Sequence, residues 1–141
     1  MSDENPVLRG GCNCGAVRYE LSGPPLAVAA CHCTQCRKQS GAAYSVNLIV
    51  KAREMTVTGE LAVFHDNDTE SGAPLAREFC AACGSPIRSV PTASPKMVAV
   101  KAGTLDDASP FAPAMHLWTR SALPWVIIPE GLPRFEKGPQ V

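Results

Sequence analysis

Seven cysteines in three short groups constrain the fold of this 141-residue chain more than any hydrophobic pattern does. The groups are a C-x-C pair, a C-x-C-x-x-C triplet and a C-x-x-C pair: Cys12 and Cys14; Cys31, Cys33 and Cys36; Cys80 and Cys83. In a reducing compartment closely spaced thiols are more often metal ligands than disulfides, and seven cannot all pair within one chain. The spacing therefore predicts metal sites.

The two outer pairs are predicted to hold one structural zinc ion. Structural zinc takes four ligands in a tetrahedron, commonly from two turns that lie far apart in sequence. A glycine follows Cys14 and another follows Cys83, and glycine tolerates the positive φ that turns backbone amides toward thiolates. Because the site closes a long loop, it should stabilise the fold. The expected ligands are Cys12, Cys14, Cys80 and Cys83.

The middle triplet, Cys31, Cys33 and Cys36, has no fourth thiol left to join it. Three thiolates are typical of a zinc site that leaves one position to water or a substrate, and such a soft site suits a ligand that is itself a thiol. Three alternatives remain open at this point. The triplet captures a histidine or carboxylate as a second structural site, partners Cys12 and Cys14 instead, or holds a disulfide and no metal.

The histidines and the basic residues near the triplet give weaker signals. His32 lies between two cysteines, so in an extended segment its ring points away from their sulfurs, as a packing or hydrogen-bonding residue does. His65 and His116 are interpreted as structural or surface residues. Arg37 and Lys38 follow the triplet directly and either attract a carboxylate of a substrate or are simply solvated.

The fold class predicted from the sequence is mainly β, with at most short helical turns. Thirteen prolines and eleven glycines interrupt the apolar stretches, so no window holds the period of a long amphipathic helix. Residues 34–40 are expected to form one helical turn with Thr34 as N-cap, and 66–74 a polar loop. Strands are expected in the runs at 16–21, 43–50, 55–60, 62–66, 77–80, 87–90, 97–103 and 125–128.

Length indicates one domain over residues 1–141, with its core at about 8–136, and the chain is expected to be cytoplasmic. Thirteen basic and thirteen acidic residues balance, which argues against a nucleic-acid or membrane partner. The acidic start MSDENPVLRG does not resemble a signal peptide, and no run approaches the roughly 20 apolar residues of a spanning helix. A homodimer is compatible with the sequence.

With the three cysteine groups in place, the chain resembles the glutathione-dependent formaldehyde-activating enzyme family, also called the centromere protein V domain family. The resemblance is carried by GGCNCGAVRYEL, CHCTQCRKQSGAAYSVNLIV and REFCAACGSPI, and more weakly by HLWTRSALPW and EGLPRFEKG. It implies a fold like that of Mss4, a group of β-sheets around a structural zinc. It also implies two zinc ions per chain: a structural one on the outer pairs and a catalytic one on Cys31, Cys33 and Cys36.

The resemblance implies a carbon–sulfur lyase that joins formaldehyde and glutathione as S-(hydroxymethyl)glutathione. The expected partners are therefore a small thiol, such as glutathione, and an aldehyde. Beyond Arg37 and Lys38, Arg120 is the one further candidate for binding a carboxylate of glutathione. The sequence offers no conspicuous general acid or base. The alternative function is a non-catalytic zinc-binding β domain that docks a protein partner, because a fold does not fix a reaction.

Overall fold

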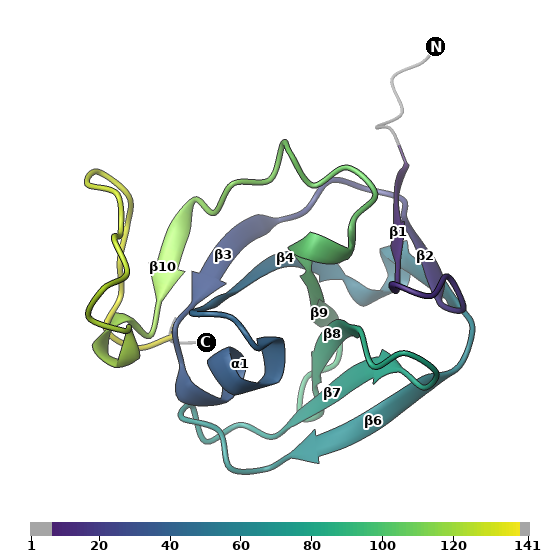
Figure 1. The fold of residues 1–141 in the computed structure, drawn as a ribbon, viewed down its shortest axis with the longest axis horizontal. Coiled ribbons are helices and arrows are strands. Elements are labelled where there is room, and N and C mark those ends of the chain that lie inside the picture. The colour runs from purple at the N-terminus through teal and green to yellow at the C-terminus, as the bar shows by residue number, and fades with distance from the viewer. Residues whose placement is uncertain (1–6, 139–141) are drawn as a thin grey trace.

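A computed structural model describes residues 7–138 and confirms the mainly β prediction (Figure 1). This part of the chain forms ten strands, one α-helix and three single-turn 3₁₀ helices: α1 (Thr34–Ser40), η1 (Ala52–Glu54), η2 (Ala102–Thr104) and η3 (Thr119–Ser121). Among these residues, none of the helices has the length and hydropathy that a membrane crossing requires.

The strands form two sheets. The smaller sheet has the antiparallel order β1–β2–β5: β1 (Leu8–Gly11), β2 (Arg18–Leu21) and β5 (Met55–Thr58). The larger sheet has the order β10–β3–β4–β9–β8–β7–β6, and in it only the β10–β3 pair is parallel. Its strands are β3 (Ala27–Cys31), β4 (Ser45–Lys51), β6 (Leu61–Asp66), β7 (Leu75–Cys80), β8 (Pro86–Pro91), β9 (Met97–Lys101) and β10 (Met115–Leu117).

The hydrophobic core joins the two sheets. Side chains alternate across a strand, so residues two apart share a face. Leu48 and Val100 are directly opposed in register and fully buried, and they belong to the same core cluster as Tyr19 and Leu21 of β2. Apolar residues of β4 and β9 on this face therefore hold the smaller sheet against the larger one.

Part of the other face of the larger sheet is polar although it is buried. Ser45, Asn47, Arg77, Ser89 and Lys101 are all buried, and all lie at odd-numbered positions of β4, β7, β8 and β9. Asn47 is paired with Lys101 and Arg77 with Ser89 in the strand register. Buried polar groups of this kind cost free energy unless they are paired, so this face is a candidate for function.

The predicted helical turn forms at residues 34–40, but the predicted N-cap was wrong by one residue. Cys33 is the N-cap, and its sulfur accepts a hydrogen bond from the backbone N–H of Cys36 at 3.1 Å. A thiolate in this position satisfies an unpaired amide of the first turn, as an oxygen cap would. The helix ends at Gly41, whose φ of 69° is left-handed.

Seven of the eight predicted strand runs contain a strand, and the eighth prediction was wrong. Residues 125–128 form no strand, because prolines flank the run and Val126 N–H closes a turn onto the carbonyl of Leu123 at 3.0 Å. Trp125 and Ile127 of this run are exposed. The sequence patterns did not reveal β1, β3 and β10.

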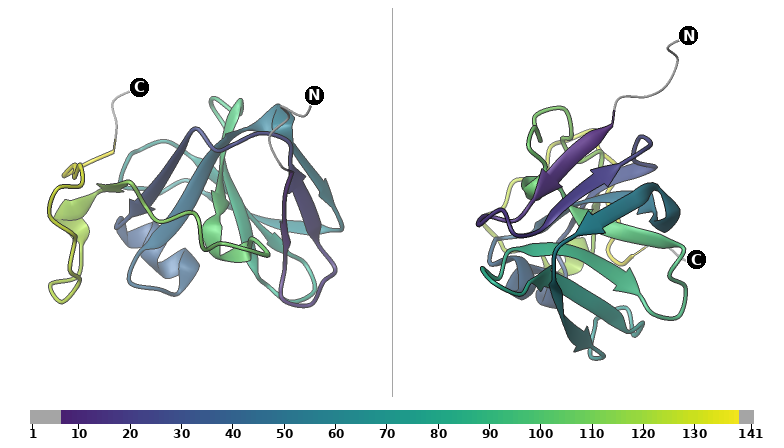
Figure 2. Two further views of the ribbon diagram at one scale, coloured as in Figure 1. Left: turned by 90° about the horizontal axis from the view of Figure 1, so that it is seen from above. Right: turned by 90° about the vertical axis from the view of Figure 1, so that its right-hand side faces the viewer.

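The C-terminal segment instead returns to β10 after this turn. The His116 N–H bonds to the carbonyl of Pro133, and the Phe135 N–H bonds to the carbonyl of His116. Figure 2 shows this segment at the opposite end of the molecule from the β1–β2 hairpin. The segment therefore lies along the outer edge of β10, and the other neighbour of β10 is β3, the strand that leads into the cysteine triplet.

Candidate metal centres

The outer cysteine pairs meet, as the sequence predicts. Cys12 and Cys14 lie in the turn after β1, whereas Cys80 ends β7 and Cys83 follows in the next turn. All four sulfurs lie within 4.8 Å of one another. The Cys12–Cys14 sulfur distance is 3.6 Å and the Cys14–Cys80 distance is 3.8 Å. A tetrahedron with zinc–sulfur bonds of about 2.3 Å requires a sulfur–sulfur distance of about 3.8 Å, so the donor set fits zinc.

Backbone amides are directed at the sulfurs of this cluster. Val17 N–H donates to the sulfur of Cys12 at 3.2 Å, and Cys83 N–H donates to the sulfur of Cys80 at 3.4 Å. Gly15 and Gly84 have φ values of 84° and 82°, as expected for turns around thiolate ligands. Such hydrogen bonds stabilise the charged form of a ligand and fix its orientation.

The middle triplet forms a second, separate cluster. Cys31 ends β3, Cys33 caps α1 and Cys36 lies within α1, and their sulfurs all lie within 4.8 Å of one another. All three side chains are buried, and Trp118 packs against them. The cluster spans only one strand end and one helical turn, so local folding alone brings the three sulfurs together.

The structure shows the triplet as a cluster of its own. Cys12 and Cys14 belong to the other cluster, and the three thiols are free rather than bridged. Among residues 7–138, no histidine or carboxylate joins the three sulfurs as a fourth ligand. A closed structural zinc site takes four protein ligands, one more than this cluster supplies among the described residues.

His32 and His116 form a buried pair beside the triplet. The His32 Nε2 lies 2.9 Å from the His116 Nδ1, and each ring is almost fully buried. Burial lowers the pKa of both imidazoles. A nearby group lowers each pKa further: His116 acts on His32, and Arg134 acts on His116. The pair therefore packs the end of β3 against β10. Among the described residues, neither ring joins the three sulfurs as a possible metal ligand. His65 is exposed on β6.

Glu70 fixes the start of α1, a role that the sequence did not reveal. Its Oε1 accepts a hydrogen bond from the Thr34 N–H at 2.7 Å, and the Ser121 hydroxyl donates to the same carboxylate at 2.9 Å. Glu70 lies in the predicted 66–74 loop, which the structure confirms as the connection between β6 and β7. The carboxylate therefore ties this loop and η3 to the turn that presents Cys33.

Trp118 covers the triplet in a strained conformation. Its φ is 58°, the left-handed region that a bulky side chain rarely adopts. Arg120 stacks over the Trp118 ring at 5.2 Å and pairs with Glu70, so this cation is already engaged. The sequence suggested Arg120 for binding a carboxylate of a substrate. The structure places it instead over Trp118, the residue that packs against the thiol cluster.

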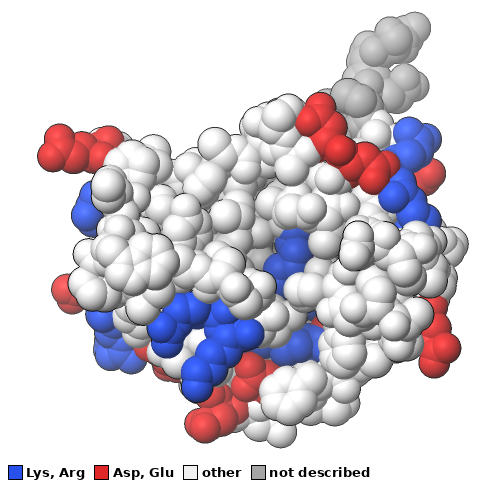
Figure 3. All heavy atoms as spheres, viewed as in Figure 1, with Lys and Arg blue, Asp and Glu red and all other residues white. Residues whose placement is uncertain are grey.

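Two buried cations face the triplet from the polar side of the larger sheet. Arg77, only 2% exposed, donates from Nε to Asp66 at 3.1 Å and places Nη1 3.9 Å from the sulfur of Cys36. Lys101 is 6% exposed. The neighbouring thiols of Cys31 and Cys33 hydrogen-bond to Cys36 and, with the two cations, lower the pKa of Cys36 to about 2. In Figure 3, basic atoms form the floor of a recess near the middle of the molecule.

The sequence interpretation did not single out Arg77 or Lys101. A signal was present, because each is a charged residue inside an apolar, alternating strand run, in LAREFC and in MVAVKAG. The basic residues that the sequence did suggest lie elsewhere: Lys38 is exposed and Arg37 is half-buried on α1. Within residues 7–138, neither side chain forms a hydrogen bond to a triplet sulfur.

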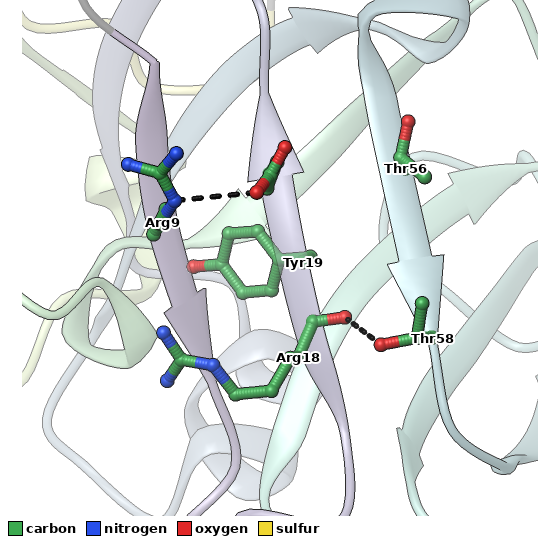
Figure 4. Close-up of a pocket in the computed structure, with 6 residues that line it drawn as sticks. Arg9, Arg18, Tyr19, Thr56 and Thr58 are labelled. Atoms are coloured by element: carbon green, nitrogen blue, oxygen red, sulfur yellow. Dashed lines mark hydrogen bonds and ion pairs between the residues drawn. The ribbon is translucent and has the colours of Figure 1, made fainter.

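A hollow of about 290 Å³ on the smaller sheet is a poorer candidate site (Figure 4). Its cations are already neutralised, since Arg9 pairs with Glu20 and Arg18 pairs with Asp106. Thr58 donates a hydrogen bond to the backbone carbonyl of Arg18, so this hydroxyl is also occupied. The hollow contains no thiol, and its residues fit a role in holding the sheet surface together.

Fold and clusters together define a β protein with two preformed cysteine clusters, one of four thiols and one of three. The family described as "Glutathione-dependent formaldehyde-activating enzyme" matches residues 7–121. A Halomonas elongata protein named "Putative glutathione-dependent formaldehyde-activating enzyme" is 31% identical over 127 residues, which cover 86% of this chain and 81% of that protein. The chain belongs to the glutathione-dependent formaldehyde-activating enzyme family.

A solved structure shares the fold. The crystal structure of a Rhodobacter sphaeroides protein, a structural genomics target, superposes with a TM-score of 0.56 and 18% sequence identity. The match covers 90% of this chain and 98% of that chain. At this identity the similarity establishes the fold and carries no conclusion about activity.

Proposed function

We propose that the protein is a zinc-dependent carbon–sulfur lyase that forms and cleaves the adduct of a small thiol with an aldehyde. Family membership supports glutathione and formaldehyde as its substrate class. The observation that carries the proposal is the buried triplet with three thiols and no fourth protein ligand in residues 7–138. A closed structural site would need that fourth ligand.

Each cluster has a separate role in this proposal. Cys12, Cys14, Cys80 and Cys83 hold a structural zinc ion that joins the β1–β2 turn to the end of β7. Cys31, Cys33 and Cys36 hold a second zinc ion. When bound, that ion supplies a Lewis-acidic centre with one position for a ligand from the substrate.

The reaction is an addition of sulfur to a carbonyl group. The thiol loses its proton, the sulfur lone pair forms a bond to the carbonyl carbon, and the π electrons of the C=O bond move to the oxygen. The oxygen then takes up one proton, which gives an S-hydroxyalkyl product, and the reverse sequence cleaves it. Negative charge thus moves from sulfur to oxygen, so cations beside the site favour the transition state.

Residues of the chain contribute orientation and electrostatics. Trp118 shields the thiol cluster from water on one side, and Glu70 holds the turn that carries Cys33. Arg77 and Lys101 lie on the polar sheet face next to the thiolates. Their positive charges stabilise the thiolate form of the cluster and are well placed for the charge that develops on the oxygen.

Cobalt substitution tests whether the second centre accepts a thiol. Glutathione added to the cobalt-loaded protein is expected to raise the thiolate-to-cobalt charge-transfer absorption by about one-seventh, because eight thiolates then bind metal instead of seven. S-methylglutathione is the control, since it differs from glutathione by one methyl group and has no free thiol. A spectrum that glutathione leaves unchanged would contradict the open site and favour a non-catalytic zinc-binding β domain.

A further inference from the structure

The polar face of the larger sheet changes character with distance from the thiol triplet. Cys31 is paired with Ser45, and two residues further along β4, about 7 Å away, Asn47 is paired with Lys101. The next row across the sheet holds Ala99, Ser89 and Arg77. Polar and cationic groups thus lie in the rows nearest the sulfurs.

Apolar side chains occupy the far end of the same face. In the register of the sheet, Leu75 is paired with Pro91, and Met97 lies two residues beyond Ala99 on β9. These residues and the polar ones nearer the sulfurs line one hollow of about 220 Å³. Pockets that enclose drug-sized ligands measure roughly 300–1,000 Å³, so this hollow fits a small molecule or one arm of a larger one.

Two buried polar atoms in this hollow have no partner among residues 7–138. They are the Nη2 of Arg77, which is a donor, and the Oδ1 of Asn47, which is an acceptor. Lys101 forms no ion pair with a carboxylate in the same range. Leaving the Arg77 N–H and the Lys101 cation unpaired costs free energy, and a ligand that accepts hydrogen bonds would recover the cost of these two groups. The hollow therefore presents donors for an acceptor atom beside the thiolates.

Charge balance distinguishes a neutral acceptor from an anionic one. Three thiolates with one zinc ion carry a formal charge of about −1, which Lys101 offsets, and Arg77 is balanced by Asp66. The cluster and its surroundings are then neutral before a substrate binds. A thiolate from the substrate already adds one negative charge, and a carboxylate in the hollow would add a second. A carbonyl oxygen adds none until the reaction moves charge onto it.

We infer that this hollow binds the aldehyde, with the carbonyl oxygen at Lys101 and Arg77 and an apolar substituent against Leu75, Pro91 and Met97. The inference rests on the proposed function, and it extends the substrate class from formaldehyde to aldehydes with a short apolar chain. Formaldehyde alone would leave the apolar end of the hollow unused. Lys101 then acts as a catalytic residue, because its ammonium contacts the oxygen on which negative charge develops.

Binding of an unreactive analogue tests the inference apart from turnover. Isobutyramide has a neutral carbonyl and an apolar branch, and isobutyrate has the same shape with a negative charge. In the zinc-loaded protein, isobutyramide is expected to shift the backbone amide resonances of Ser89 and Ala99 and to bind at least tenfold tighter than isobutyrate. Ala99→Leu fills the hollow and should weaken isobutyramide at least tenfold. The control is Lys96→Met, an exposed lysine on the approach to β9.

Turnover gives a second readout, the kcat/KM for isobutyraldehyde relative to that for formaldehyde with glutathione as the thiol. Ala99→Leu is expected to lower this ratio at least tenfold. Formaldehyde turnover with an unchanged ratio and no isobutyramide binding would overturn the inference and leave the proposed function standing. Tighter binding of isobutyrate would also overturn it. Isobutyramide binding without any thiol response in the cobalt spectrum would support the hollow and remove the proposed function instead.

Discussion

Cys80→Ala is expected to lower the melting temperature by more than about 12 °C, and to melt at least about 6 °C below Cys36→Ala. Loss of a structural metal costs more than about 4 kcal/mol, and 1 kcal/mol shifts the melting temperature of a chain this size by about 3 °C or more. The outer cluster joins residues that are 66 positions apart. The triplet spans only five, and loop closure makes the difference worth about 2 kcal/mol.

Cys83→Ala is the matched control for this comparison. Cys80 is buried in the core, so its truncation also removes packing, whereas Cys83 is exposed. If the metal is the cause, Cys83→Ala should destabilise the protein nearly as much as Cys80→Ala, as followed by circular dichroism during thermal unfolding. Equal melting temperatures for Cys80→Ala and Cys36→Ala would show that the outer cluster has no special structural role.

Cys36→Ser is expected to reduce zinc from two ions to one per chain and to lower kcat/KM for adduct formation at least about 100-fold. Even groups that only orient a metal ligand are worth 10–100-fold, and this change removes a ligand itself. The far-UV circular dichroism and a cooperative unfolding transition should remain, because the outer cluster is intact. Zinc content and activity are measured on the same preparation.

Ala42→Ser controls for the added hydroxyl, since Ala42 is exposed just beyond the end of α1. It should keep two zinc ions and the activity of the unmodified protein. Cys36→Ser protein that loses one zinc and retains its full rate would separate the triplet from catalysis. The remaining function would then be that of a binding domain with a dispensable second metal.

The cysteine spacing predicted both clusters because ligand chemistry leaves few ways to arrange seven thiols. Spacing alone could not exclude a fourth ligand for the triplet, since the partner of such a site can lie anywhere in the sequence. In the structure, His32 lies against His116, and Glu70 accepts a hydrogen bond at the start of α1. Both groups are thereby engaged away from the three sulfurs.

Strand prediction succeeded where apolar residues alternate and failed where other forces decide. β3 has the alanine-rich sequence AVAAC and β1 contains two glycines, so neither resembles a strand by propensity. Tertiary pairing with β4 and β2 fixes them as strands. The WVII run has strong propensity, but its flanking prolines and a turn leave it unpaired.

The polar sheet face was the part least accessible from the sequence. Arg77 and Lys101 are separated by 24 positions and lie in different apolar runs, so only the strand register places both beside the triplet. Long side chains that carry a charge are usually solvated, which makes an isolated arginine or lysine a weak signal. Their burial, and not their identity, marks them as candidates.

Zinc content measured by elemental analysis, together with a count of reactive thiols in the native protein, tests the central claim most directly. The protein should be purified without chelator. Two zinc ions per chain, with all seven thiols unreactive until the metal is removed or the chain is denatured, is the result predicted by a four-thiolate and a three-thiolate centre. One zinc ion or fewer, with Cys31, Cys33 and Cys36 freely reactive in the native protein, would contradict it.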